Sequence, residues 1–265
     1  MTARGFNLLW PLSEEAFDRA CAPVAPAVTL RGLLPRAAQA ILVASGGREL
    51  FARFQSAAQA SDGRPDPLDR FTRATLEEAV GLALRSRQPP DDRAGAALAY
   101  RLFFPFVDGS AAGSAAGSAA GSAAGSAGSE PTLPFQRLGR AAGLGGPSPL
   151  GLQIHPHYGP WWAYRAVIVV AAETGAPAAV SVASPDASLG DGCAGCDAPC
   201  VAACPGAAVR REGFSVIACH AHRLAAPPCQ LSCVARIRCV RGPSQRYTDE
   251  QLAFHMAASM PGRRP

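Results

Sequence analysis

Residues 193–205 read C-A-G-C-D-A-P-C-V-A-A-C-P. This stretch places four cysteines at gaps of two, three and three residues, and Pro205 follows the last of them. Eight of the nine cysteines of this 265-residue chain lie between Cys193 and Cys239. Thiols spaced this closely do not fit a disulfide framework spread over a secreted fold, because cysteines two or three residues apart can bind the same small metal centre. The sequence therefore predicts a metal-binding module in this part of the chain.

The spacing is typical of iron–sulfur proteins. The bacterial sequence C-x2-C-x2-C-x3-C-P differs by one residue in its second gap, and its fourth cysteine ligates the other of two clusters. We therefore predict two [4Fe–4S] clusters with crossed ligation. The first takes Cys193, Cys196, Cys200 and Cys239, and the second takes Cys204, Cys219, Cys229 and Cys233. Pro205 favours iron–sulfur over zinc, whose sites do not call for it; a pair of structural four-cysteine zinc sites is the alternative.

Arginine is the only basic residue apart from histidine, and it is in excess around the cysteines. The arginines between residues 186 and 246 are Arg210, Arg211, Arg223, Arg236, Arg238, Arg241 and Arg246. A four-thiolate cluster carries net negative charge, so nearby cations compensate it and raise its reduction potential. Nucleic-acid binding is the rival explanation, but no aromatic-interleaved basic stripe or recognition motif is present, and we do not expect it.

Two features of the sequence bear on where the protein works. No apolar run reaches the length of a membrane span, and the apolar part of the N-terminus is too short for a secretory signal. Clustered thiols that are not exported belong to a reducing compartment, where they hold metal instead of oxidising. We therefore predict a cytoplasmic protein whose partner is a redox protein and which has no membrane partner.

The order of the elements predicts an α+β protein. It is divided into an N-terminal α/β part (1–108), a low-complexity Gly/Ser/Ala linker (109–130), a continuation of the α/β core (131–185), a cluster domain (186–246), and a C-terminal helix and tail (247–265). The G-S-A-A repeats of the linker have no means of burying a core. Whether they are natural is left open by the sequence.

Hydrophobic periodicity and capping residues place the individual elements. Predicted strands are 27–30, 40–44, 151–154, 165–170 and 180–182. Predicted helices follow Ser13, begin near Glu49, run over 75–87, 94–103 and 135–144, and follow Thr248. Thr75 with Glu78, and Thr248 with Gln251, have the spacing of capping boxes. Cys21, far from the other cysteines, is predicted to be a small buried apolar residue of a helix.

A second informative stretch is I-H-P-H-Y-G-P-W-W-A-Y-R-A-V, residues 154–167. One interpretation is a rigid turn from His155 to Pro160, with Trp161 and Trp162 packing at a domain boundary. The histidine pairs 155/157 and 220/222 alternate in a way that suits metal, although satisfied or exposed histidines are commoner. His220 and His222 follow Cys219 and are candidates to donate hydrogen bonds to cluster sulfur; His255 is expected to pack.

The cysteine pattern from Cys193 to Cys239 resembles the C-terminal ferredoxin module of epoxyqueuosine reductases, whose eight cysteines hold two [4Fe–4S] clusters with the same crossed ligation. Residues 154–167 resemble both that family and the cblC-type vitamin B12-processing proteins, and R-Y-T-D-E-Q-L-A-F (246–254) is similar to the tail of the latter. The resemblance covers Phe135 to Met256. It implies a nitroreductase-like α/β core followed by a small two-cluster ferredoxin-like domain, and a corrinoid as a further cofactor.

By this resemblance Arg165 matches an arginine that cblC-type proteins place near their thiol cosubstrate. His155, Tyr158 and Trp161 would line the wall beside the cofactor or cluster, together with Gly159 and Trp162. The function we expect is one-electron relay by two [4Fe–4S] clusters in a ferredoxin-like protein. A corrinoid- or flavin-linked reductase related to epoxyqueuosine reductase, and a structural zinc-binding protein, are the alternatives.

Overall fold

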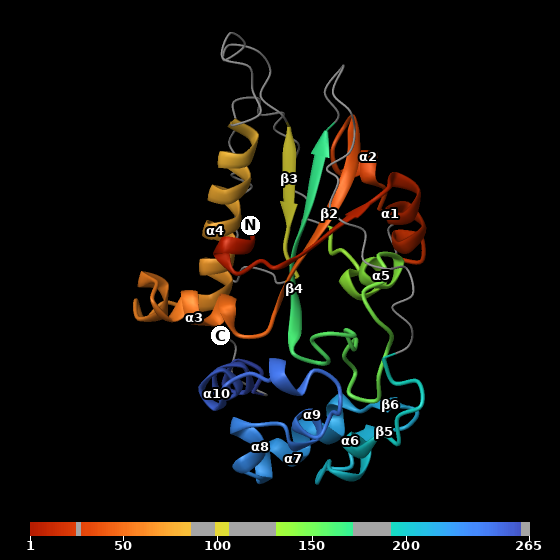
Figure 1. Ribbon diagram of the computed structural model, residues 1–265, viewed down its shortest axis with the longest axis vertical. Helices are drawn as coiled ribbons and strands as arrows, with labels where there is room; N and C mark the ends of the chain where they lie inside the picture. Colours follow the sequence, from red (N-terminus) through yellow and green to blue (C-terminus); the bar gives the residue numbers. More distant parts are fainter. Residues whose placement is uncertain (25–27, 86–98, 106–130, 172–191, 261–265) are drawn as a thin grey trace. The chain divides into compact units, whose positions relative to one another are not determined.

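The computed structural model of the protein describes residues 1–24, 28–85, 99–105, 131–171 and 192–260 (Figure 1). The elements are η1 (Thr2–Arg4), β1 (Leu8–Leu12), α1 (Glu14–Cys21), α2 (Leu30–Leu33), β2 (Ala37–Gly46), α3 (Glu49–Gln55), η2 (Ala58–Ala60), α4 (Pro67–Arg85), β3 (Tyr100–Phe103), α5 (Phe135–Ala141), β4 (Trp162–Ala171), α6 (Pro199–Ala202), β5 (Val209–Arg210), β6 (Gly213–Phe214), α7 (Val216–Ala225), α8 (Pro228–Leu231), α9 (Val234–Ile237), η4 (Pro243–Gln245) and α10 (Asp249–Ala258). The mixture of helices and strands confirms the α+β class. The predicted linker 109–130 and the predicted strand 180–182 lie outside the described residues.

Two compact units interleave along the chain. The sheet unit comprises Met1–Ala44, Pro67–Ala142 and Tyr164–Ser184, and the cysteine unit comprises Ser45–Asp66, Gly143–Ala163 and Pro185–Pro265. The predicted domains, in contrast, follow one another along the sequence. Residues 45–66 and 143–163 are the segments that the interleaving adds to the unit with the clustered cysteines.

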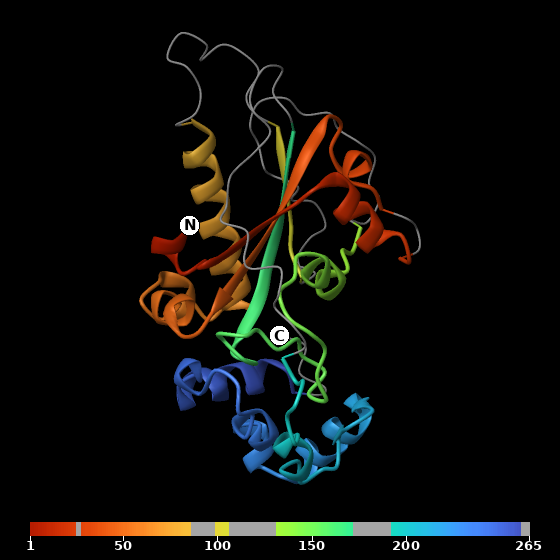
Figure 2. The same cartoon turned by 45° about the vertical axis from the view of Figure 1, so that its right-hand side comes forward.

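The sheet unit is built on a four-stranded sheet with the strand order β1-β2-β4-β3. β1 pairs antiparallel with β2, with Trp10 opposite Leu42, and β3 pairs antiparallel with β4, with Leu102 opposite Ile168. Figures 1 and 2 show α4 on one face of this sheet and α1, α2 and α5 on the other. Leu42 and Val43 are adjacent and both buried, as expected of a central strand that is covered on both faces.

Local signals explain the helix starts of the sheet unit. The Ser13 hydroxyl accepts from the backbone N–H of Ala16 and caps α1, as the sequence predicted, and Glu14 and Glu15 occupy its first turn. Cys21 ends this helix and is fully buried, which confirms its predicted apolar role. Burial and the charge of Asp18 raise the pKa of its thiol to about 11, so it is not a reactive thiolate.

Two element predictions for the sheet unit are wrong, and one predicted helix is present but begins earlier than expected. Leu30 begins α2 instead of ending a strand, because the Thr29 hydroxyl accepts from the N–H of Gly32 and caps a helix there. α4 begins at Pro67, a residue suited to a first helical position, so Thr75 lies inside it. Residues 100–103 form β3 and not a helix, because pairing with β4 overrides a weak local preference.

The cysteine unit holds α3, the segment 143–163 and the chain from residue 192 onward. α3 is joined to α10 by rings: Phe254 lies 5.3 Å from Phe51 and 5.4 Å from Phe54 between centroids. The Gly47 N–H donates to the carbonyl of Trp161, and Nε of Arg48 donates to the carbonyl of Arg246. The start of α3 at Glu49 and the capping of α10 by Thr248 agree with the sequence predictions.

The segment 143–163 is largely irregular. The predicted strand 151–154 is wrong: Ile154 makes only an isolated bridge with Gly146, and His155 makes one with Gly159. β4 begins at Trp162, three residues before the predicted strand.

Among the described helices, none combines the length and the apolarity that crossing a bilayer requires.

Candidate functional site

Two pockets of the cysteine unit sort the eight clustered cysteines into two sets of four. We name as quartet 1 the set Cys193, Cys196, Cys200 and Cys239, which lines one pocket. We name as quartet 2 the set Cys204, Cys219, Cys229 and Cys233, which lines the other. Each pocket contains about 340 Å³ of space between atoms, part of it open to solvent. The two memberships coincide with the two ligand sets that the spacing predicted, including the remote Cys239.

The local chain of quartet 1 is a turn followed by a short helix. The Cys196 N–H donates to the carbonyl of Cys193 over 3.0 Å, which brings the first two thiols to one side of the turn. The Ala198 N–H then donates to Sγ of Cys196 over 3.4 Å. Pro199 at the start of α6 needs no hydrogen-bond partner for its nitrogen, and Cys200 follows it, 7% exposed.

The extra residue in the gap between Cys196 and Cys200 has a structural consequence. Ala198 adopts a left-handed backbone conformation, with φ 56° and ψ 55°. This conformation reverses the chain between the two cysteines, so that both reach the same pocket. It costs a residue with a Cβ roughly 1–2 kcal/mol. The gap is therefore accommodated by local strain at one residue.

Quartet 2 is carried mainly by helices. The Ser215 hydroxyl accepts from the N–H of Ala218 and starts α7, which carries Cys219 in its first turns. Pro228 starts α8 and places Cys229 next. Cys233 stands just before α9. Each thiol of this set after Cys204 is therefore placed by the beginning of a helix.

The crossing of the two quartets is explained by α6 and α9, which pack against each other. α6 contains Cys200 of quartet 1 and ends two residues before Cys204 of quartet 2. α9 lies between Cys233 of quartet 2 and Cys239 of quartet 1. Both helices thus run from one pocket to the other, and four helical residues rise only about 6 Å. The two pockets are therefore close neighbours.

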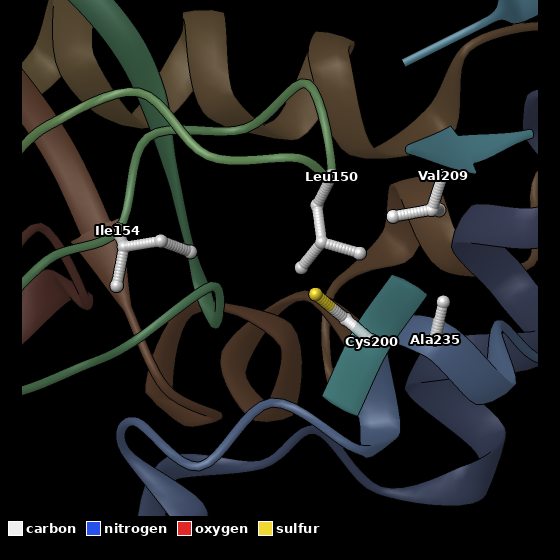
Figure 3. Packing of buried hydrophobic residues seen from close by; sticks show 5 residues of the cluster. All are labelled: Leu150, Ile154, Cys200, Val209 and Ala235. Carbon is white, nitrogen blue, oxygen red and sulfur yellow. The ribbon is translucent and has the colours of Figure 1, made fainter. Parts of the chain in front are cut away.

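A small apolar cluster contributes lining residues to both pockets. It consists of Leu150, Ile154, Cys200, Val209 and Ala235 (Figure 3). Figure 3 shows the sulfur of Cys200 pointing toward Leu150. The cysteines packed against this cluster are Cys193 and Cys239 from quartet 1 and Cys204 and Cys233 from quartet 2. One shared apolar core therefore packs against cysteines of both quartets.

The thiols are electrostatically costly to ionise together. Burial raises the pKa of Cys200 and Cys239, and charge on neighbouring thiols of quartet 1 raises it further. Burial raises the pKa of Cys219 and Cys229 as well, and again the neighbouring thiols of their own set add to it. Four thiolates in one buried pocket therefore need positive charge nearby, which a metal centre supplies.

Side chains and main chain supply part of that positive charge. At quartet 1, the backbone N–H groups of Cys200 and Val201 lower the pKa of the Cys200 thiol. The backbone of Arg241 and the charges of Arg241 and Arg236 lower that of Cys239. At quartet 2, the charge of Arg223 lowers the pKa of Cys219 and Cys229. Within the part of the chain that the structure describes, no three His, Cys, Asp or Glu side chains are grouped as ligands of a single metal ion.

The arginines that the sequence singled out fall into different places. Arg241 is exposed and lines the pocket of quartet 1, and its Nε donates to the carbonyl of Gly192. Arg223 is buried and lines the pocket of quartet 2. Arg236 lies over the rings of Trp161 and Tyr247, 4.7 Å and 4.8 Å from their centroids, and donates to the carbonyl of Pro160.

His155 organises a tight turn. Its Nδ1 accepts from the N–H groups of His157 and Tyr158, over 3.1 Å and 3.2 Å, and its main chain exchanges two hydrogen bonds with Gly159. Burial, with the charge of His157 as a smaller cause, lowers the pKa of His155 to about 4. The imidazole is therefore neutral near pH 7, as an acceptor Nδ1 requires.

The other residues proposed for the cofactor wall lie in two units. Tyr158 contacts the rings of His155 and His157, and burial raises the pKa of its hydroxyl. Trp161 is fully buried against Tyr247. Both belong to the cysteine unit, as His155 does, whereas Arg165 is buried in the part of β4 that belongs to the sheet unit.

The remaining histidines differ in their surroundings. His222 lines the pocket of quartet 2, while His220 is absent from the described lining of both pockets. Nε2 of His157 lies 3.2 Å from Nε2 of Gln245. His255 packs against the rings of Phe51 and Tyr247, as the sequence predicted.

Several lining residues were not found from the sequence. Leu150 and Ile154 line the pocket of quartet 1, although this segment was interpreted as a strand. Met256 of the terminal helix lines the pocket of quartet 2. A run of prolines and glycines from 145 to 151 was the available signal for an irregular first segment. No local sequence pattern marks Met256, because only tertiary packing places this residue at the pocket of quartet 2.

Comparison with known proteins adds no relative to this geometry. No family model and no curated protein matches the chain.

Proposed function

We propose that the protein is a ferredoxin-like one-electron carrier that holds two [4Fe–4S] clusters, one in each quartet. The observation that carries the proposal is the sorting of eight cysteines into two adjacent pockets, four to each. When bound, such a cluster accepts one electron from a donor protein and releases it to an acceptor protein. Under the same proposal the sheet unit is the nitroreductase-like core, and the protein works in the cytoplasm, where thiols stay reduced.

The residues of the chain fit a cluster in three ways. Each pocket offers four thiols, which is the ligand set of a [4Fe–4S] cluster. Both pockets combine apolar walls, such as Leu150 at quartet 1 and Met256 at quartet 2, with an arginine. In both pockets burial raises the pKa of thiols, so a cationic centre is needed to keep these cysteines as thiolates.

A zinc ion makes a different demand on the same cysteines. Zn–S bonds of about 2.3 Å in a tetrahedron bring the four sulfurs to roughly 3.8 Å from one another. A cubane gives each cysteine its own iron corner, so its four sulfurs stand farther apart. The two centres therefore differ in metal content, one zinc ion against four irons for each quartet, and metal analysis separates them.

For electron transfer, the chain's own contribution is position and protection. α6 and α9 connect the two quartets over a few residues each, and the apolar cluster that includes Ala235 packs against cysteines of both. Under the proposal, the two redox centres are near neighbours and share apolar side chains. A relay of single electrons is the chemistry that such an arrangement serves.

The test is anaerobic reconstitution with iron and sulfide, followed by metal analysis, visible spectra and EPR after reduction with dithionite. The expected result is about eight iron and eight sulfide per chain, a broad visible absorption that bleaches on reduction, and EPR signals of two interacting clusters. A colourless protein with two zinc ions per chain contradicts the proposal. A spectral shift of added hydroxocobalamin that Arg165→Ala abolishes would instead support the corrinoid-linked reductase.

A further inference from the structure

Arg223 stands apart from the other arginines of the cysteine unit. It is 4% exposed and lies in the last turn of α7, one helical turn beyond Cys219. It also lines the pocket of quartet 2. A charge at this depth requires compensation, since burial of an unpaired ion is costly. What compensates Arg223 is therefore informative about the pocket.

The terminal helix compensates one side of the guanidinium. Its Nη1 donates to the carbonyl of Ser259 over 2.8 Å, and its Nη2 donates to the carbonyl of Met256. These carbonyls lie at the C-terminal end of α10, where the helix dipole favours a cation. The side chain is therefore held in a fixed orientation by main-chain atoms.

The third nitrogen of the guanidinium, Nε, differs from Nη1 and Nη2. Among the described residues, Nε of Arg223 is buried and has no hydrogen-bond partner. Arg236 and Arg246 also have a buried Nε without a partner, but they lie over the ring of Trp161 and are not in the described lining of either pocket. Arg223 thus combines an open donor, a buried charge and a place beside four thiols.

We propose that Arg223 is a positioning residue that donates its Nε–H to the cluster of quartet 2 and raises that cluster's reduction potential. The inference rests on the proposed function and adds a regulator of one site. A buried cation stabilises the reduced cluster, which carries one more negative charge, more than it stabilises the oxidised one. A hydrogen bond to sulfur acts in the same direction. The terminal helix, by holding Arg223, becomes part of the redox site.

The experiment is an anaerobic redox titration of the full-length, cluster-loaded protein, followed by EPR. In Arg223→Gln the charge is lost, whereas the glutamine amide keeps an N–H donor at the same number of bonds from Cα as Nε, so this variant tests the charge. At a fixed solution potential, the ratio of reduced to oxidised quartet 2 cluster is expected to fall about tenfold, which equals a midpoint about 59 mV lower for one electron. The quartet 1 cluster is expected to keep its midpoint. Arg238→Gln, which removes an exposed arginine outside the described lining of both pockets, is the matched control.

Arg223→Lys separates charge from hydrogen bond and covers a folding failure of the glutamine variant. The lysine keeps the charge and is expected to show a smaller fall, with loss of one exchangeable proton coupled to the quartet 2 cluster in proton ENDOR. Unchanged midpoints in the variants that retain eight iron overturn this inference and leave the proposed function standing. A wild-type protein that binds zinc instead of iron overturns both.

Discussion

The two quartets differ in the source of the positive charge around their sulfurs. At quartet 1 main-chain N–H groups donate from Ala198 to Cys196 and from Arg241 to Cys239, and the charges of Arg236 and of the exposed Arg241 also lower the pKa of Cys239. At quartet 2 a buried side chain, Arg223, supplies the charge. Main-chain donors depend on the path of the backbone, whereas a buried guanidinium is one residue. Quartet 1 is therefore expected to respond to changes of backbone shape, and quartet 2 to changes of a single charge.

The largest effect is expected from removal of one thiol, either Cys200 within α6 or Cys204 just after it. Cys200→Ala should lose the quartet 1 cluster and Cys204→Ala the quartet 2 cluster, although the two cysteines are only four residues apart. Each variant is expected to retain about four of the eight irons. Iron analysis and EPR of the remaining cluster make the measurement.

Remote partners provide the control for this assignment. Cys239→Ala should leave the same EPR signal as Cys200→Ala, and Cys229→Ala the same signal as Cys204→Ala. If Cys239→Ala resembled Cys204→Ala instead, the crossed assignment would be wrong, and the comparison of the quartets would fail with it.

The next effect concerns the backbone beside quartet 1. Gly159 has φ +57°, and a Cβ there would come within 2.1 Å of the carbonyl oxygen of Arg241, two residues after Cys239. Gly159→Ala is therefore expected to lower the free energy of unfolding by about 3–4 kcal/mol, from left-handed strain and from displacement of the 241–242 backbone. Anaerobic urea unfolding measures the loss. The quartet 1 cluster should be lost at a lower urea concentration than the quartet 2 cluster.

Gly63 is the matched control for this substitution. It also has a left-handed backbone, with φ +70°, but a Cβ there would meet nothing within 4 Å. Gly63→Ala is expected to cost about 1–2 kcal/mol, the strain alone. Equal losses in the two alanine variants would show that the close approach to Arg241 does not matter.

Acid should weaken the same backbone region. The pKa of His155 is lowered to about 4, below its value of about 6.5 in an unfolded chain. Between these values the unfolded chain binds a proton that the folded protein does not, so stability falls as the pH is lowered from 6.5 toward 4. At pH 5 the loss relative to pH 7 is expected to be about 2 kcal/mol from this group. Urea unfolding at the two pH values measures it.

His155→Asn isolates this contribution. An asparagine oxygen can accept from the N–H groups of His157 and Tyr158, as Nδ1 of His155 does, and it does not titrate in this range. The variant is expected to lose about 2 kcal/mol less than the wild type between pH 7 and pH 5. A pH dependence as steep as that of the wild type would place the acid-sensitive group elsewhere.

The sequence was most informative where chemistry and spacing act together. Eight cysteines with one proline were enough to predict two sets of four, because thiols at such gaps have few ways to meet around small centres. The capping residues Ser13 and Thr248 also fixed their helices, since a side-chain cap acts within three residues.

Features that depend on distant contacts were not predictable in the same way. β3 is stabilised by pairing with β4, a strand much later in the chain; Tyr100 and Phe103 favour a strand, but they do not identify this partner. Arg223 was one of seven arginines in this part of the sequence, and only its burial and its contacts with the end of α10 distinguish it from Arg238. Spacing identifies candidate ligands, whereas burial decides which neighbours act on them.

The smallest effect tests the strained gap of quartet 1. Ala198 and Ala207 both have a left-handed backbone, with φ 56° and φ 47°, and each lies near one quartet. Replacement by glycine relieves about 1–2 kcal/mol of strain but costs about 0.5–1 kcal/mol of chain entropy, so each variant should gain roughly 0.5–1 kcal/mol. Thermal unfolding under anaerobic conditions should show a similar small rise of the midpoint temperature for both.

The redox response of these two glycine variants should differ, because the Ala198 N–H donates to Sγ of Cys196, while the Ala207 N–H donates to the carbonyl of Cys204. A more flexible residue 198 weakens a hydrogen bond to a ligand sulfur and lowers the quartet 1 potential slightly, whereas Ala207→Gly leaves both potentials in place. An anaerobic redox titration of each variant makes the measurement. If both variants shifted the potentials equally, main-chain donors would not be what distinguishes quartet 1 from quartet 2.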